Sequence, residues 1–154
     1  MMKDIFESYM EDNRTRQKDS VNGMMGVEFV EAQEEEQSAT FRFTVLPWEA
    51  NRYGKLHGGI MGTMLDHSCG LAVSGYTGFN GVTLSMSVDY IRSATVGDHL
   101  LCKATLVSTG RRVIRVRGEL YHESTGELVA TCSATFYNKG EHTQTTTKQE
   151  SAHV

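Results

Sequence analysis

The sequence has few of the residues that mark specialised classes of protein. Its 154 residues include one proline, one tryptophan and three cysteines, and the cysteines Cys69, Cys102 and Cys132 lie 33 and 30 positions apart. An odd number of widely spaced cysteines provides neither a disulfide framework nor the paired spacing of a thiolate metal site. We therefore expect the three to be small buried groups in a reducing compartment.

Long apolar runs and a strong excess of one charge are also missing. No stretch approaches the ~20 apolar residues that span a bilayer, and the first residues lack the apolar core of a signal peptide. Fifteen Lys and Arg against nineteen Asp and Glu give a net charge of −4, which offers no broad attraction for nucleic acid or anionic lipid. We expect a cytoplasmic protein whose partners include no nucleic acid and no membrane.

The composition, 39% hydrophobic and 22% charged, is that of one globular domain. In residues 1–20, apolar side chains recur at helical spacing among charges from position 3 to about 18, which predicts an amphipathic helix lying on a larger body. After Gly140 the sequence is polar, so residues 141–154 are expected to form a disordered tail. Residues 21–140 remain as the folded domain.

Two periodicities predict the elements of that domain. Alternating apolar and polar residues predict two strands between residues 27 and 45 and four more between 83 and 136. Between these groups, the apolar residues from 56 to about 74 lie all round a helix, as in a buried helix. The predicted fold class is α+β, a curved antiparallel sheet wrapped around a long central α-helix. Such a sheet leaves edges that oligomerisation can cover.

The start of the buried helix carries the clearest sign of chemistry. A loop ends there at two glycines, Gly58 and Gly59. The first N–H groups of a helix have no partner within it and carry partial positive charge, so a bare glycine entrance presents donors to an incoming oxygen. If that oxygen is a carbonyl that gains negative charge during acyl transfer, the Gly58 N–H forms half of an oxyanion site.

Asp66 lies in the middle of the same helix, where an ionised carboxylate is costly unless it is hydrogen-bonded or paired. It can be a general base or a nucleophile, or it can be structural, bonding a neighbouring hydroxyl or reaching solvent. Asp66 follows Gly58 by eight residues, which places it ~12 Å along the helix axis and ~80° around it. Within one chain the two residues therefore cannot both reach the same ester carbon. Two antiparallel helices across a two-fold axis can bring them together. The predicted site is therefore shared between subunits.

These residues resemble a known family. The chain is similar, over about residues 20 to 140, to hotdog-fold acyl-CoA thioesterases of the phenylacetate-degradation (PaaI-like) type. The resemblance rests on Asp66 and on the preceding pattern Asn51-x-x-Gly54-x-x-His57-Gly58-Gly59. It implies a hydrolase that converts acyl-CoA thioesters to free acid and CoA, with no cofactor apart from the CoA of its substrate. It also implies a homodimer or a dimer of dimers, that is, a homotetramer.

The resemblance also implies a role for each site residue. The Gly58 N–H polarises the thioester carbonyl, and Asp66 of the partner subunit activates water or attacks directly. Asn51 helps to position water or the carbonyl, and Thr83, or less readily Ser85, orients the water. The family's motif histidine, His57, is expected to shape the loop rather than transfer protons. Asn51 as a plain turn residue and Thr83 as a plain strand residue are the alternatives.

The CoA phosphates of such a substrate favour basic residues at the surface. Arg111 and Arg112 form the best basic cluster of the chain, although a solvated turn explains them equally well. The competing candidates are Arg52, Lys55 and Arg92. No metal site is predicted.

Two other functions stay open at this point. A hydratase or dehydratase of acyl thioesters would need His57 and an acid as paired proton carriers. In a non-catalytic acyl-binding module, the buried Asp66 would be structural.

Overall fold

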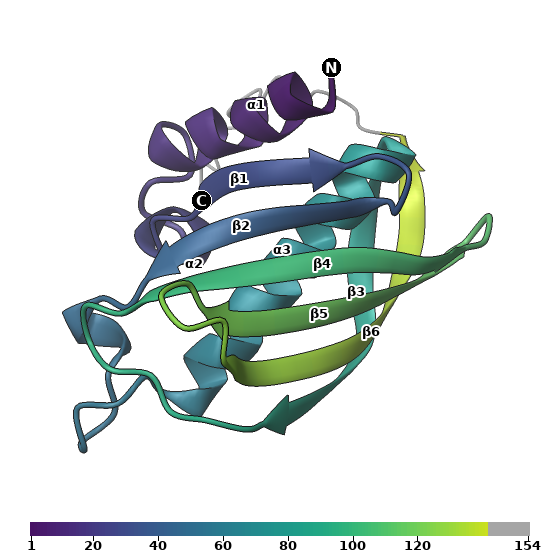
Figure 1. The fold of residues 1–154 in the computed structure, drawn as a ribbon. Coiled ribbons are helices and arrows are strands. Elements are labelled where there is room, and N and C mark those ends of the chain that lie inside the picture. The colour runs from purple at the N-terminus through teal and green to yellow at the C-terminus, as the bar shows by residue number, and fades with distance from the viewer. Residues whose placement is uncertain (142–154) are drawn as a thin grey trace, which may run out of the picture.

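The computed structural model describes residues 1–141, which form a six-stranded antiparallel sheet curved around one long helix (Figure 1). The strand order is β1-β2-β4-β5-β6-β3. The fold class predicted from the sequence is thereby confirmed. The elements in chain order are α1 (Met2–Arg14), α2 (Val21–Met24), β1 (Glu28–Gln33), β2 (Ser38–Thr44), η1 (Pro47–Glu49), α3 (Gly58–Thr77), β3 (Phe79–Tyr90), β4 (His99–Thr109), β5 (Val113–His122) and β6 (Leu128–Glu141).

The central helix α3 is buried on almost every side because small residues let its neighbours approach. A Cβ atom on Gly75 would lie 2.5 Å from the Phe6 ring of α1, and one on Gly118 of β5 would lie 2.7 Å from Cys132 Sγ. Both positions therefore require glycine. The helix ends at Gly78, whose φ of 72° is a left-handed conformation that favours glycine. The chain enters β3 at once.

Helix α1 lies across β1 and the C-terminal half of α3 (Figure 1). Phe6 is fully buried and stacks on Phe29 of β1 with ring centroids 5.1 Å apart. Met10, one turn later, is 1% exposed. The apolar side of this helix therefore seals one flank of α3, although the helix stops at Arg14 instead of continuing to about residue 18.

Strand β3 forms one edge of the sheet and pairs only with β6 among the described strands. Its apolar side chains are not all covered, since Val82, Leu84 and Tyr90 are 43%, 59% and 57% exposed. An unpaired strand edge with exposed apolar side chains is a feature that favours pairing with another chain in proteins generally.

The remaining sequence predictions about the fold are resolved in part. Within residues 1–141 no helix is long and apolar enough to cross a membrane. All three cysteines are buried free thiols, as expected, and Cys69 Sγ lies 3.8 Å from Cys132 Sγ. Strand β6 continues to Glu141, and the rest of the predicted tail, residues 142–154, lies outside the described residues.

Candidate active site

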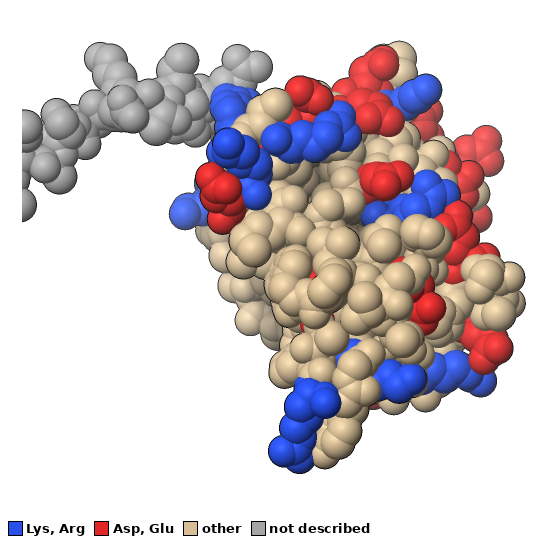
Figure 2. All heavy atoms as spheres, turned by 90° about the vertical axis from the view of Figure 1, so that its left-hand side faces the viewer, with Lys and Arg blue, Asp and Glu red and all other residues tan. Residues whose placement is uncertain are grey.

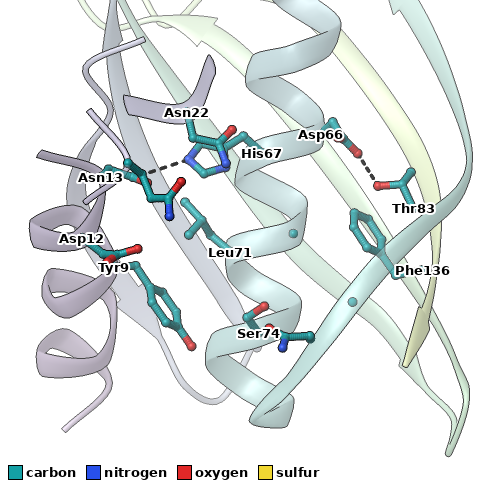
Figure 3. A pocket seen from close by; sticks show the side chains of 14 residues that line it. Tyr9, Asp12, Asn13, Asn22, Asp66, His67, Leu71, Ser74, Thr83 and Phe136 are labelled. Atoms are coloured by element: carbon teal, nitrogen blue, oxygen red, sulfur yellow. Dashed lines mark hydrogen bonds between the residues drawn. The ribbon is translucent and has the colours of Figure 1, made fainter. Parts of the chain in front are cut away.

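Asp66 and Thr83 meet across the space between α3 and β3. The Thr83 hydroxyl donates to Asp66 Oδ1 at 2.6 Å (Figure 3), the short length typical of a hydrogen bond to a carboxylate. Both residues line a cavity of about 390 Å³. One carboxylate oxygen is thus held in place, while Oδ2 forms no hydrogen bond among the described residues. An oriented, accessible carboxylate of this kind can act as a base or a nucleophile.

The local form of β3 decides which hydroxyl reaches Asp66. Thr83 pairs with Phe136 of β6, but the ladder is irregular between Thr83 and Ser85, which pairs with Thr135. A bulge of this kind re-aims the side chains beside it. Thr83 is half-buried against Asp66, whereas Ser85 is exposed.

Gly58 is the first residue of α3, and among the first four N–H groups of the helix its own is the one without a hydrogen-bond acceptor in the described residues. The Gly59 N–H donates to His57 Nδ1 at 2.9 Å, and the Ile60 and Met61 N–H groups donate to the His57 carbonyl. The Gly58 N–H has no acceptor among the described residues. The Gly58 carbonyl accepts a hydrogen bond of 2.9 Å from the Tyr90 hydroxyl at the end of β3.

His57 is the N-cap of α3, and its ring serves the helix start. Because Nδ1 accepts from the Gly59 N–H, that nitrogen carries no proton in this arrangement. The backbone N–H of His57 donates to the backbone carbonyl of Glu49 at 2.9 Å. The ring is exposed.

Asn51 closes the loop that leads to the helix. Its Oδ1 accepts from the N–H groups of Tyr53 and Lys55 at 2.9 and 3.1 Å, the pattern of an Asx turn. Its Nδ2 group forms no hydrogen bond within residues 1–141 and remains a donor. Asn51 therefore fits the turn alternative and keeps a polar group for a ligand.

The structure brings the predicted residues together in two groups. Asn51, His57 and Gly58 gather at the start of α3, and Asp66 and Thr83 lie near its middle. Eight helical residues, ~12 Å, separate Gly58 from Asp66. Within one chain the two groups do not face a common point.

The predicted phosphate ligands Arg111 and Arg112 lie in the exposed turn between β4 and β5. Arg112 Nη1 donates to the Tyr137 hydroxyl at 3.3 Å. The register places Val113, Tyr137 and Val82 in one row across β5, β6 and β3, so this turn lies at the same end of the sheet as Thr83.

The competing basic residues lie elsewhere. The Arg52 guanidinium lies 4.9 Å from the centre of the Tyr53 ring in the loop before α3, and Lys55 Nζ donates to Thr95 Oγ1. Figure 2 shows Lys and Arg at both the upper and the lower end of its view, on either side of a largely uncharged middle, and the lower end is the one at which this loop projects in Figure 1. Arg92 is paired with Glu127.

Two features of the site had no signal in the sequence. Glu49 is fully buried in the loop before α3, where its Oε1 accepts from the Leu46 N–H at 2.6 Å and its Oε2 has no partner among the described residues. Burial raises the pKa of this carboxyl. Beside Asp66, His67 faces α1, and Asn13 Nδ2 lies 3.4 Å from its Nε2. Burial lowers the pKa of His67 to about 4.

No group of three or more His, Cys, Asp or Glu side chains within residues 1–141 is placed to hold a metal ion.

Comparison with known proteins decides the family. A family model described as the thioesterase superfamily matches residues 53–129, half of the chain, and includes Gly58, Asp66 and Thr83. The chain belongs to the thioesterase superfamily. The resemblance inferred from the Asn51–Asp66 pattern is thereby confirmed.

Members with names and solved structures support the assignment. Acyl-coenzyme A thioesterase 13 of Mus musculus is 28% identical over 81 residues, which are 52% of this chain and 58% of the relative. The match thus spans little more than half of that relative's length. A Streptococcus mutans protein bound to acetyl-CoA superposes with a TM-score of 0.69 at 30% identity, covering 76% of this chain and 91% of the other. A thioesterase-like, phenylacetic acid degradation-related protein of Ralstonia eutropha gives 0.71 at 31% identity, covering 77% and 89%.

Proposed function

We propose that this protein hydrolyses acyl-CoA thioesters to the free acid and CoA. The observation that carries the proposal is the Asp66 carboxylate, held by the Thr83 hydroxyl at 2.6 Å on the wall of a cavity. The unpartnered Gly58 N–H supplies the complementary feature, a donor for a carbonyl oxygen that gains charge. The mouse relative named for acyl-CoA hydrolysis and the streptococcal protein with acetyl-CoA support this substrate class.

The proposed site is shared by two subunits. Since Gly58 and Asp66 are separated along one helix, a single chain cannot bring both to the same thioester carbon. Two copies of α3 lying side by side and antiparallel place Gly58 and Asn51 of one subunit opposite Asp66 of the partner subunit. The exposed Val82 and Leu84 on the edge strand β3 support pairing on this side of the molecule. A further pairing of two such dimers is compatible with this arrangement.

In the proposed reaction the thioester carbonyl accepts a hydrogen bond from the Gly58 N–H. Asp66 removes a proton from water, and the resulting hydroxide adds to the carbonyl carbon to give a tetrahedral oxyanion. Collapse of this species breaks the C–S bond. The CoA thiolate leaves and takes the proton from Asp66, so that the acid and CoA–SH are released. Direct attack by Asp66 would instead give an anhydride that water then hydrolyses.

The other predicted residues position the reactants. Thr83 fixes the orientation of the Asp66 carboxylate, and the Nδ2 group of Asn51 is a donor for water or the carbonyl. His57 holds the helix start through its acceptor nitrogen, so it is not poised as the proton carrier that a hydratase would need. Arg111 and Arg112 are proposed to bind the CoA phosphates, because they are neighbouring exposed cations at the Thr83 end of the sheet.

Crotonyl-CoA tests the proposed function, because its products separate the candidate activities. Mass spectrometry is expected to find free CoA and crotonic acid, and Asp66→Asn is expected to lower kcat by about 10²–10⁴-fold. Glu35→Gln, which neutralises an exposed carboxylate in the turn between β1 and β2 and outside the residues that line the cavity, serves as the matched control with wild-type turnover. A hydrated ester would assign the protein to the lyases, and an unchanged ester would leave a binding module. Wild-type turnover in Asp66→Asn would remove Asp66 from the mechanism.

A further inference from the structure

The cavity beside Asp66 does not stop at the reactive carboxylate. It runs over the outer face of α3 to α1, so that Asp66 and Thr83 lie on one side of the helix and His67 and Leu71 on the other (Figure 3). Ten of its fourteen lining residues are polar. A wall made for an unsubstituted alkyl or aryl group would be mainly apolar, since binding sites match the surface that they bury.

The far wall is built by polar residues of the N-terminal region. Asn13 of α1 is only 9% exposed, yet its amide group lines the cavity and lies 3.4 Å from His67 Nε2. Asn22 of α2 lines the same wall. A nearly buried amide has four hydrogen-bonding positions, and this long contact uses one of them. The remaining positions suit a ligand that can donate and accept hydrogen bonds.

The charge of the cavity limits what the ligand's end can be. No Lys or Arg is among its lining residues, while Asp12 and Asp66 are. Asp12 is already paired with Arg16 at 2.6 Å, which leaves Asp66 as the uncompensated charge. A carboxylate on the ligand would therefore meet repulsion and no cationic partner.

We propose that this cavity holds the acyl part of the thioester and selects acyl groups whose far end carries an uncharged hydrogen-bonding group, such as a hydroxyl or an amide, with Asn13 as a residue that determines the selection. This inference rests on the proposed hydrolysis, because that reaction fixes the orientation of the acyl group in the cavity. Its thioester end lies at Asp66, and its far end lies against α1.

The experiment compares CoA thioesters of matched length that differ only at the end: hexanoyl, 6-hydroxyhexanoyl and adipoyl, with the ten-carbon counterparts. We expect kcat/KM for the hydroxy ester to exceed that of the alkyl ester by roughly two- to tenfold, the range of one neutral hydrogen bond, and the carboxylate ester to be slowest. Asn13→Leu should abolish or reverse the hydroxyl preference. Glu11→Leu, an exposed substitution on the same helix, should keep it.

Asn22→Ala provides a second variant at an exposed position, in case Asn13→Leu does not fold. A hydroxyl preference that is missing in the wild type, or unchanged in both cavity variants, would overturn the selection.

Failure of hydrolysis is a separate result. If no ester releases CoA, the proposed function fails, and the selection is then decided by the affinities of non-hydrolysable CoA thioethers with hexyl and 6-hydroxyhexyl tails. Tighter binding of the hydroxylated tail, lost in Asn13→Leu, supports the selection, and equal binding overturns it.

Discussion

Gly58 allows a backbone N–H to be removed without changing the helix. It lies at the first position of α3, where proline is well tolerated because the N–H has no acceptor within the helix. His57 before it has φ −63° and ψ 133°, the extended backbone that a following proline requires. Gly58→Pro therefore removes the proposed oxyanion donor and keeps the start of α3.

We expect Gly58→Pro to lower kcat by about 10²–10³-fold, the cost of losing one such donor. Gly58→Ala is the matched control, because it keeps the N–H and adds a Cβ at 3.4 Å from the Tyr90 ring, an ordinary contact. Steady-state kinetics on one acyl-CoA, with circular dichroism to confirm the fold, measures both. Equal losses in the two variants would assign the effect to the added atoms and contradict the role of the N–H.

Single residues differ in how far the sequence alone reveals them. Gly58 and Asp66 could be singled out because a glycine at a helix start and an acid inside an apolar helix are local anomalies. Glu49 and Asn13 could not, since a carboxylate in a loop and an amide among charged residues are both ordinary features of a sequence. Their burial arises from segments that the fold brings against them, and no local pattern records it.

Among the elements, helix α1 affects the pKa of His67, which it covers. It shields His67, whose pKa falls to about 4 because burial disfavours the charged ring. An unfolded histidine takes up its proton near pH 6.5, whereas the folded one stays neutral down to about pH 4. In this window the unfolded chain binds more protons, so the free energy of unfolding falls as the pH falls.

The expected loss is up to about 1.4 kcal/mol per pH unit between pH 6.5 and 4, and it is absent above this window. Urea unfolding of the wild type and of His67→Gln between pH 7 and 4.5 measures it. The glutamine variant should show a shallower decline over the same range, because it has no proton to gain. Parallel profiles would show that His67 is not the group responsible.

The elements themselves could be predicted to different extents. Helix α3 and most strands follow from their periodicity, which depends only on which faces are buried. The alternation predicts a strand that begins at residue 83, but β3 begins at Phe79, because Asn80 and Gly81 interrupt the alternation that identifies a strand. The apolar face of α1 was predictable, but its position against α3, and hence its place in the cavity wall, depends on long-range packing of Phe6.

At the scale of the whole molecule, the proposed site needs two chains, and two inactive variants can test this. A mixed dimer of Asp66→Asn and Gly58→Pro has one site with both intact groups and one with neither. Random pairing in an equal mixture makes half of the dimers mixed, so about a quarter of the wild-type activity is expected to return. Native mass spectrometry confirms that mixed dimers form. No recovery in their presence would place both groups in one subunit's site.

Tyr90 connects the uncovered edge strand to the proposed oxyanion donor. It is the last residue of β3, the strand with the uncovered edge, and its hydroxyl holds the Gly58 carbonyl at 2.9 Å. The Gly58 carbonyl is thus anchored to β3, whereas the Gly58 N–H is left free to bind substrate. In the proposed dimer, a second chain that binds at β3 restrains Tyr90 and, through its hydrogen bond, the Gly58 peptide. Dimer formation therefore helps to fix the direction in which the Gly58 N–H points.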